Sequence, residues 1–135
     1  MEHLIIDSKL SEIDKVRRFL NEILLILNLS EEKHFAIELS LLEICTNIMR
    51  YAYPEKKDKI FLKTWREKDN LFLEIRDNGI PFDPREAKKP DIKKIIETEQ
   101  VGGFGIFITR QFMDGFDYKR EHNQNILTLF KKLSA

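Results

Sequence analysis

The sequence has few of the features that stabilise secreted domains or hold proteins in membranes. Its 135 residues include one cysteine, which excludes an internal disulfide, and Cys45 lies in an apolar helical pattern that predicts a buried, unreactive thiol. The longest aliphatic run, residues 23–27, is far shorter than the roughly 20 residues that span a bilayer. The N-terminus MEHLIIDSKL lacks the basic start and long apolar core of a secretion signal. We therefore expect a cytoplasmic protein.

The chain also lacks a net charge, because its 23 basic residues balance its 23 acidic residues. It therefore has no general electrostatic attraction for nucleic acid or for anionic membranes, and neither is an expected partner. With 42% hydrophobic residues and no repeat or low-complexity linker, the chain is long enough to bury one core without a metal or a disulfide. We predict a single domain over residues 1–135.

The hydrophobic period changes from helical to strand-like along the chain. A short strand at residues 3–7 precedes a helix that Ser8 is expected to cap, and Ser30 opens a second helix that runs to about Ala52. Alternating apolar residues then predict two antiparallel hairpins, one over residues 59–77 and one over residues 115–133. Between the hairpins lie an irregular polar segment and an apolar helix that begins on glycines.

The second helix carries a narrow polar stripe. Glu43, Asn47 and Arg50 are spaced by four and three residues, so their side chains share one face. One interpretation is an ordinary solvated helix face. The other is a site in which a carboxylate accepts a proton or orients a hydroxyl group and an amide oxygen binds Mg²⁺.

The stretch DNGIPFDP follows the first predicted hairpin and looks at first like another turn. An Asn-Gly pair is a strong hairpin signal, but Pro81 and Pro84 lack backbone donors and prevent a further strand. A buried strand therefore ends on Asp77, followed by Gly79 and a stiff loop.

A third segment, VGGFGIF, places glycines directly before a helix. Gly102, Gly103 and Gly105 let backbone N–H groups approach an anion, and a helix N-terminus favours phosphate. The segment has neither the lysine of a P-loop nor the βαβ context of a dinucleotide fingerprint. Taken alone, it is more simply interpreted as a structural turn.

In this order, the three segments resemble the motifs of the GHKL, or Bergerat-fold, ATPases, and most closely those of the anti-sigma factor serine kinases of bacterial partner switching. ELSLLEICTNIMRYAYP is similar to the N-box of that family, RDNGIPFDP to its first glycine box, and GGFGIFITRQFMD to its second. The resemblance covers nearly the whole chain. It implies an α+β fold, a two-layer α/β sandwich with a mixed, largely antiparallel sheet and helices on one face. It also implies an ATP lid at about residues 84–101.

The resemblance also implies roles for individual residues. Glu43 stands at the position of the general base, and Asn47 at the position that binds Mg²⁺. Asp77 stands where the family accepts a hydrogen bond from the adenine amino group, and Gly79 where a glycine lets the base pack closely. The implied cofactors are ATP and Mg²⁺. The implied nucleotide-binding residues are Asn47, Asp77, Gly79, Gly102, Gly103, Phe104, Gly105 and Thr128.

The function implied by the resemblance is that of a serine kinase that also acts as an anti-sigma factor. Its acceptor would be a serine of a STAS-type anti-anti-sigma protein, and its other partner a sigma factor. Two alternatives stay open: a nucleotide-responsive binding module without efficient phosphotransfer, and a detached histidine-kinase catalytic domain. The first helix is more apolar than most surface helices, and related kinases commonly dimerise through this region, so we expect a homodimer.

The sequence departs from the family pattern at two places. Arg50 stands where the family often has histidine, and a guanidinium does not titrate there. Some relatives carry a basic residue just before the second glycine box, where this chain has Glu99, Gln100 and Val101. A lysine of the lid, Lys93 or Lys94, is the expected substitute.

Overall fold

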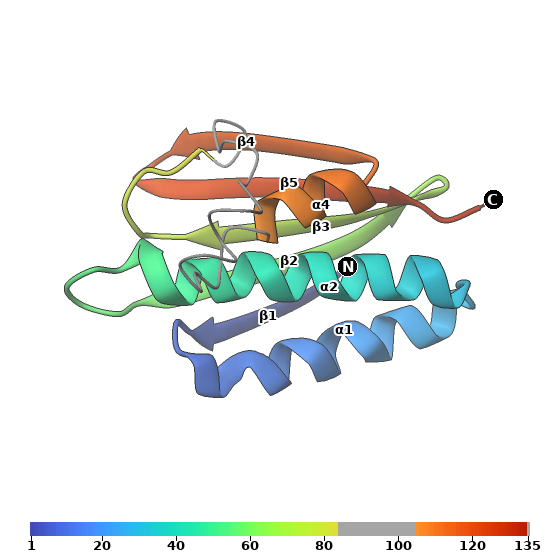
Figure 1. Cartoon of the computed structure of the whole chain (residues 1–135), viewed down its shortest axis with the longest axis horizontal. Coiled ribbons are helices and arrows are strands. Elements are labelled where there is room, and N and C mark those ends of the chain that lie inside the picture. The colour runs from blue at the N-terminus through green and yellow to red at the C-terminus, as the bar shows by residue number, and fades with distance from the viewer. Residues whose placement is uncertain (84–104, 135) are drawn as a thin grey trace, which may run out of the picture.

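The structure is a computed structural model that describes residues 1–83 and 105–134, with the backbone alone for residues 105–108. A single sheet has the strand order β1-β2-β3-β5-β4, and helices lie across it (Figure 1). The strands are β1 (Glu2–Asp7), β2 (Lys59–Glu67), β3 (Asn70–Asp77), β4 (Gly115–Glu121) and β5 (Gln124–Lys132). The helices are α1 (Ile13–Leu27), α2 (Glu31–Asn47) and α4 (Gly105–Phe112), with a 3-10 turn η1 (Leu10–Glu12) before α1 and a π-helical turn η2 (Ile48–Ala52) after α2.

Both predicted hairpins are present, and every strand pairing among the described residues is antiparallel. The turn of the second hairpin consists of His122 and Asn123, which both have positive φ, as a tight turn between two twisted strands requires. The pairing of β3 with β5 joins the two hairpins into one sheet and places Asp77 opposite Asn125. The predicted α+β two-layer architecture is confirmed.

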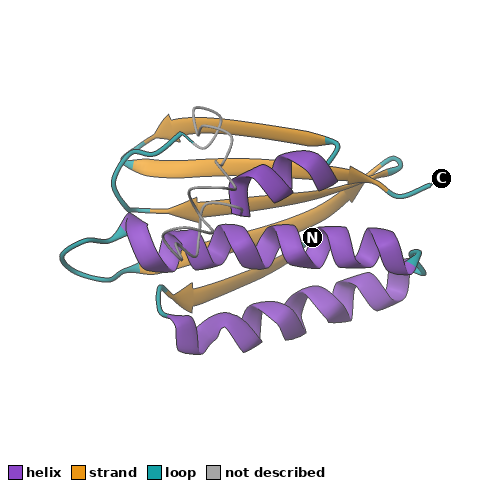
Figure 2. Ribbon diagram, viewed as in Figure 1, coloured by secondary structure: helices purple, strands orange, loops and turns teal. Residues whose placement is uncertain are grey.

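The helices cover one face of the sheet (Figure 2), and the core lies between the two layers. Ser30 caps α2 as predicted, because its Oγ accepts a hydrogen bond from the Lys33 N–H at 3.2 Å. Ser8 does not cap the first helix: it is fully buried, and η1 and then α1 begin after it. None of the described helices is long and apolar enough to cross a membrane.

The second helix buries the face that the sequence predicted. Leu41, Cys45 and Met49 are buried in the core, and burial raises the pKa of the Cys45 thiol to about 12, which keeps it protonated and unreactive. The π-helical turn continues α2 to Ala52, the residue at which the sequence predicted its end. The end of this helix lies beside the ends of the central strands and forms one wall of the site.

Candidate functional site

A cavity of about 290 Å³ lies between the end of α2 and strands β3, β4 and β5. Its interior is mostly aliphatic, and the more exposed side chains of Tyr51, Ile80 and Phe82 belong to its lining as well. Such a shape suits a flat apolar ligand that carries a few polar groups. The lining residues are Ile44, Asn47, Ile48, Tyr51, Ala52, Ile75, Asp77, Ile80, Phe82, Tyr118, Asn125 and Leu127.

Asp77 provides the carboxylate of the cavity, at the end of β3. Its side chain is only 4% exposed, and its Oδ1 accepts hydrogen bonds from the Gly79 N–H at 2.8 Å and from Asn125 Nδ2 at 3.0 Å. Burial raises the pKa of Asp77, while these two hydrogen bonds and the charge of Arg120 oppose the rise. Within the described part of the chain, Oδ2 accepts no hydrogen bond, so this oxygen is the acceptor that Asp77 offers to a ligand.

Asn125, at the start of β5, is a site residue that the sequence did not reveal. Its Nδ2 donates to Asp77 Oδ1 and, at 2.8 Å, to the Ile80 carbonyl oxygen. Its Oδ1 accepts from the Tyr118 hydroxyl group at 2.6 Å and from the Phe82 N–H at 3.3 Å. One buried side chain thus joins β3, β4, β5 and the loop after Asp77. The sequence shows only that a polar residue stands early in the last strand. This residue can be assigned to the site only when the pairing of β5 with β3 is known.

Gly79 permits a close approach, but the close neighbour is protein. A Cβ atom at this position would lie 2.4 Å from the Ala52 carbonyl oxygen, which also accepts a hydrogen bond from the Ile80 N–H at 2.9 Å. Gly79 does not line the cavity. In the structure this glycine lets the loop after β3 pack against the end of η2, and its packing against a base stays a prediction.

Tyr53 holds the same loop from the other side. Its hydroxyl group donates to the Lys59 carbonyl oxygen at 2.6 Å and accepts from the Asn78 N–H at 2.7 Å. Burial raises the pKa of Tyr53 to about 12, so the hydroxyl group stays neutral and keeps both hydrogen bonds at physiological pH. The loop that follows Asp77 is thereby fixed at both of its sides.

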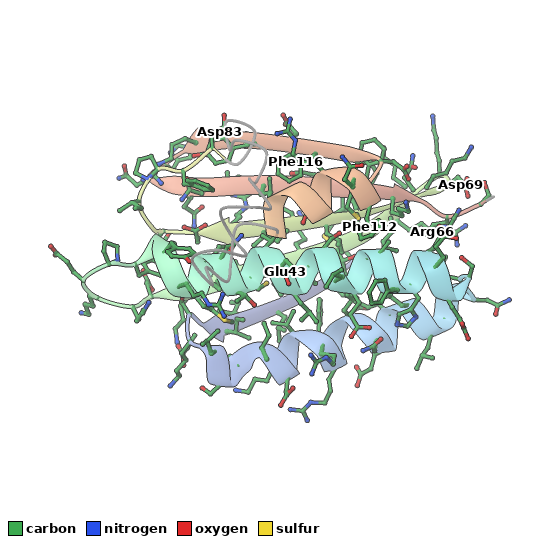
Figure 3. All side chains as sticks on the ribbon, in the orientation of Figure 1. Glu43, Arg66, Asp69, Asp83, Phe112 and Phe116 are labelled. Carbon is green, nitrogen blue, oxygen red and sulfur yellow. The ribbon has the colours of Figure 1, made fainter. Side chains whose placement is uncertain are left out.

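Glu43 and Asn47 lie one turn apart on α2, and Figure 3 labels Glu43 on this helix. Asn47 lines the cavity, whereas Glu43 is half-buried and lies outside the lining. Neither side chain makes a hydrogen bond or an ion pair within residues 1–83 and 109–134, and Arg50 is exposed. An amide oxygen and a carboxylate are both hard ligands, so this part of the helix is suited to Mg²⁺ and to a hydroxyl group.

The other predicted residues lie elsewhere. Thr128 does not line the cavity: it stands between Leu127, which lines it, and Leu129, which is in the core, so its side chain points to the opposite face of the sheet. Gly105 is the first residue of α4. Gly102, Gly103, Phe104, the lid at about 84–101, and its Lys93 and Lys94 lie outside the described residues.

Comparison with known proteins identifies relatives over most of the chain. Residues 6–131 match the histidine kinase-like ATPase domain family. The serine/threonine-protein kinase BtrW of Bordetella bronchiseptica is 32% identical over 101 residues, which are 74% of this chain and 71% of BtrW. The serine-protein kinase RsbW of Bacillus cereus is 29% identical over 100 residues, which are 71% of this chain and 61% of RsbW. The match therefore spans about two thirds of the length of these relatives.

Solved structures have the same fold. The RsbU and RsbW domains of a Mycobacterium tuberculosis protein align with 100% of this chain and 33% of that chain, with a TM-score of 0.66 and 15% identity. A histidine kinase domain from a blue-light activated kinase of Erythrobacter litoralis aligns with 76% of this chain and 45% of that chain, with a TM-score of 0.53 and 18% identity. At these identities the likeness concerns the fold.

Proposed function

Because the chain belongs to the histidine kinase-like ATPase domain family, we propose that it binds ATP with Mg²⁺ and transfers the terminal phosphate to a serine of a partner protein. The observation that carries this proposal is the largely apolar cavity with the buried Asp77 among its lining residues. The relatives named serine or serine/threonine-protein kinases support the choice of acceptor.

The cavity fits an adenine base. Its aliphatic walls and aromatic residues bury a flat ring, and the free Oδ2 of Asp77 accepts a hydrogen bond from the exocyclic amine. Guanine carries a carbonyl group at the corresponding position, so a buried carboxylate would face another acceptor. The lost hydrogen bond costs about 1 to 3 kcal/mol.

The phosphates would then extend from the base along α2, toward Asn47 and Glu43. Asn47 would hold Mg²⁺ through its amide oxygen, and the bound ion would neutralise charge on the phosphates. Glu43, one turn away and outside the cavity lining, would accept a hydrogen bond from the acceptor hydroxyl group and orient it. In this proposal catalysis consists mainly of positioning and charge stabilisation.

The proposed partners follow from the family resemblance. The acceptor is a STAS-type anti-anti-sigma protein, and the other partner is a sigma factor that the nucleotide-bound protein sequesters in the cytoplasm. The names of the kinase relatives are consistent with this assignment.

A homodimer is part of the proposal. Leu25 and Ile26 of α1 are 75% and 84% exposed, so the helix presents large apolar side chains that the fold itself leaves uncovered. We expect light scattering at high micromolar concentration to give the mass of two chains. A monomer at that concentration would contradict a dimer and would leave this surface for the sigma factor.

A second candidate is a nucleotide-responsive binding module that sequesters its partner without efficient phosphotransfer. The observation that favours it is the absence of a basic residue at positions 99–101, directly before the second glycine box.

The decisive experiment is transfer of radiolabelled phosphate from ATP to a candidate STAS protein, run beside calorimetric measurement of ATP and partner binding. We expect label on a serine of the partner. If the protein binds both ATP and the partner and labels no serine, the kinase proposal fails and the binding module replaces it. Failure to bind ATP would overturn both.

A further inference from the structure

Asn125 is 6% exposed and lines the cavity. Its amide group nevertheless keeps no donor or acceptor for a ligand, because all four of its hydrogen-bonding positions are used within the protein. Two of its four hydrogen bonds fix the orientation of the group without ambiguity. The Phe82 N–H can only donate, so it must face Oδ1, and the Ile80 carbonyl oxygen can only accept, so it must face Nδ2. The amide nitrogen therefore has to point at Asp77.

This orientation affects the balance between the ionised and protonated forms of Asp77. A buried carboxyl group has two states: ionised, with both oxygens as acceptors, or protonated, with one oxygen as a donor. An N–H from Asn125 and an N–H from Gly79 both point at Oδ1. Hydrogen bonds donated to a carboxylate favour its ionised form, in opposition to the burial.

We propose that Asn125 is a positioning residue that fixes the hydrogen-bonding sense of the cavity: it occupies Asp77 Oδ1, and it leaves Oδ2 as an unprotonated acceptor that selects a base with an exocyclic amine. The inference rests on the proposed function in one respect, namely that the ligand is an adenine nucleotide. It goes further by assigning the selectivity to a residue that acts through Asp77.

Among the described residues, the charged and titratable groups around Asp77 are few. Arg120 of β4 donates to the Gly79 carbonyl oxygen at 2.8 Å and favours the ionised carboxylate by its charge. Tyr53 and Tyr118 approach from the segment after η2 and from β4, and Asp58 contributes a more distant negative charge that acts on Tyr53. Within residues 1–83 and 109–134, Asn125 is therefore the one neutral side chain that bonds to Asp77 directly.

Replacement by aspartate is the sharpest test, because Asn125→Asp keeps the size of the side chain and removes both N–H donors. It places two carboxyl groups within hydrogen-bonding distance, which raises the apparent pKa of the pair, since like charges disfavour ionisation. Protonated Asp77 offers a donor in place of an acceptor. ATP affinity should therefore fall about tenfold or more near pH 6 and recover in part toward about pH 9, as the proton is lost.

The experiment is calorimetric titration of the full chain with ATP and with GTP from about pH 6 to about pH 9. For the wild-type protein we expect a strong preference for ATP that changes little with pH. For Asn125→Asp we expect a preference that shrinks at low pH and returns as the pH rises. Asn123→Asp makes the same chemical change in the exposed turn two residues away and should behave like wild type.

Several outcomes would overturn the inference. One is an Asn125→Asp protein that keeps the wild-type preference at every pH. Another is an Asn125→Asp protein that loses the same affinity for ATP and for GTP at every pH and has a lowered melting temperature, which would show that Asn125 has a structural role alone. If Asn125→Asp does not fold, Asn125→Ala decides, because it removes the donor to Asp77 Oδ1 without adding a charge. An ATP preference unchanged from wild type over the whole pH range would then contradict the inference. ATP binding by the wild-type protein is the control: if it is present, these outcomes overturn only the role of Asn125, and if it is absent, the proposed function fails.

Discussion

The two ends of the site differ in how their polar side chains are held. At the base end, Asp77 and Asn125 are buried and bond to each other, and Asn125 also bonds to the loop that carries Ile80 and Phe82. At the reaction end, Glu43 and Asn47 are half-buried and have no hydrogen-bonding partner within the described residues. The fold itself organises the first end. At the second end, the side chains of Glu43 and Asn47 are carried by a rigid helix, and the metal or substrate that binds there would orient them.

Under the proposed function, this difference would let one fold be strict about its base and adaptable in its reaction. A network of satisfied buried hydrogen bonds has one low-energy arrangement, so it recognises a ligand without further rearrangement. Side chains without partners cost little to reorient, and they can adjust to a metal, a phosphate and an acceptor hydroxyl group. Substitutions at the base end should therefore change affinity and stability, whereas Glu43 should change the rate.

The largest expected effect is on the rate at the reaction end. Glu43→Ala should lower phosphate transfer by about 10² to 10⁴ if the carboxylate takes part in proton transfer, while ATP affinity stays within a few-fold of wild type. Asn47→Ala should weaken Mg-ATP binding and thereby remove every ATP-dependent activity. The measurement is radiolabel transfer beside calorimetry for each variant.

Cys45→Ser, on the same helix but buried in the core, is the matched control. It should lose a modest part of the free energy of unfolding and keep its nucleotide affinity. Undiminished transfer by Glu43→Ala would show that the catalytic residue lies elsewhere, and the contrast between the two ends would then lose its functional meaning.

A smaller effect is expected where the loop after β3 packs against η2. Gly79→Ala places a methyl carbon 2.4 Å from the Ala52 carbonyl oxygen, closer than van der Waals contact allows, so the loop and the helix end must separate. Overpacking of this kind costs about 1 to 3 kcal/mol, and we expect a lower melting temperature together with weaker ATP binding. Thermal unfolding followed by circular dichroism, with and without ATP, measures both changes. A variant of wild-type stability and affinity would mean that the loop tolerates displacement and is not preorganised.

The sequence predicted most of the fold because its signals are local. Alternation over residues 59–77 predicts a hairpin whatever lies beside it, and Ser30 marks the start of α2 by its own capping chemistry. The prediction that Ser8 caps the first helix was wrong, because a capping serine and a buried serine in a connecting segment cannot be told apart in the sequence. The three motif segments then led to the family, in which fold and approximate site are shared.

The details of the site depend on contacts between distant residues. Asn125 reaches Asp77 because β5 pairs with β3, and no local pattern reveals which strands are neighbours. Thr128, the threonine of the closing strand, is directed away from the cavity by strand alternation, whereas Asn125, three residues earlier, lines it. The role of Gly79 in nucleotide binding stays a prediction, and its close neighbour Ala52 is visible only in the structure.

The most direct test of the account is calorimetric comparison of ATP and GTP binding to the wild-type protein and to Asp77→Ala. The account predicts tight, magnesium-dependent binding of ATP, an affinity for GTP lower by about 1 to 3 kcal/mol, and loss of tight ATP binding in Asp77→Ala while its circular dichroism spectrum stays that of a folded protein. Equal affinity for ATP and GTP, or an Asp77→Ala variant that binds ATP as the wild type does, would contradict it.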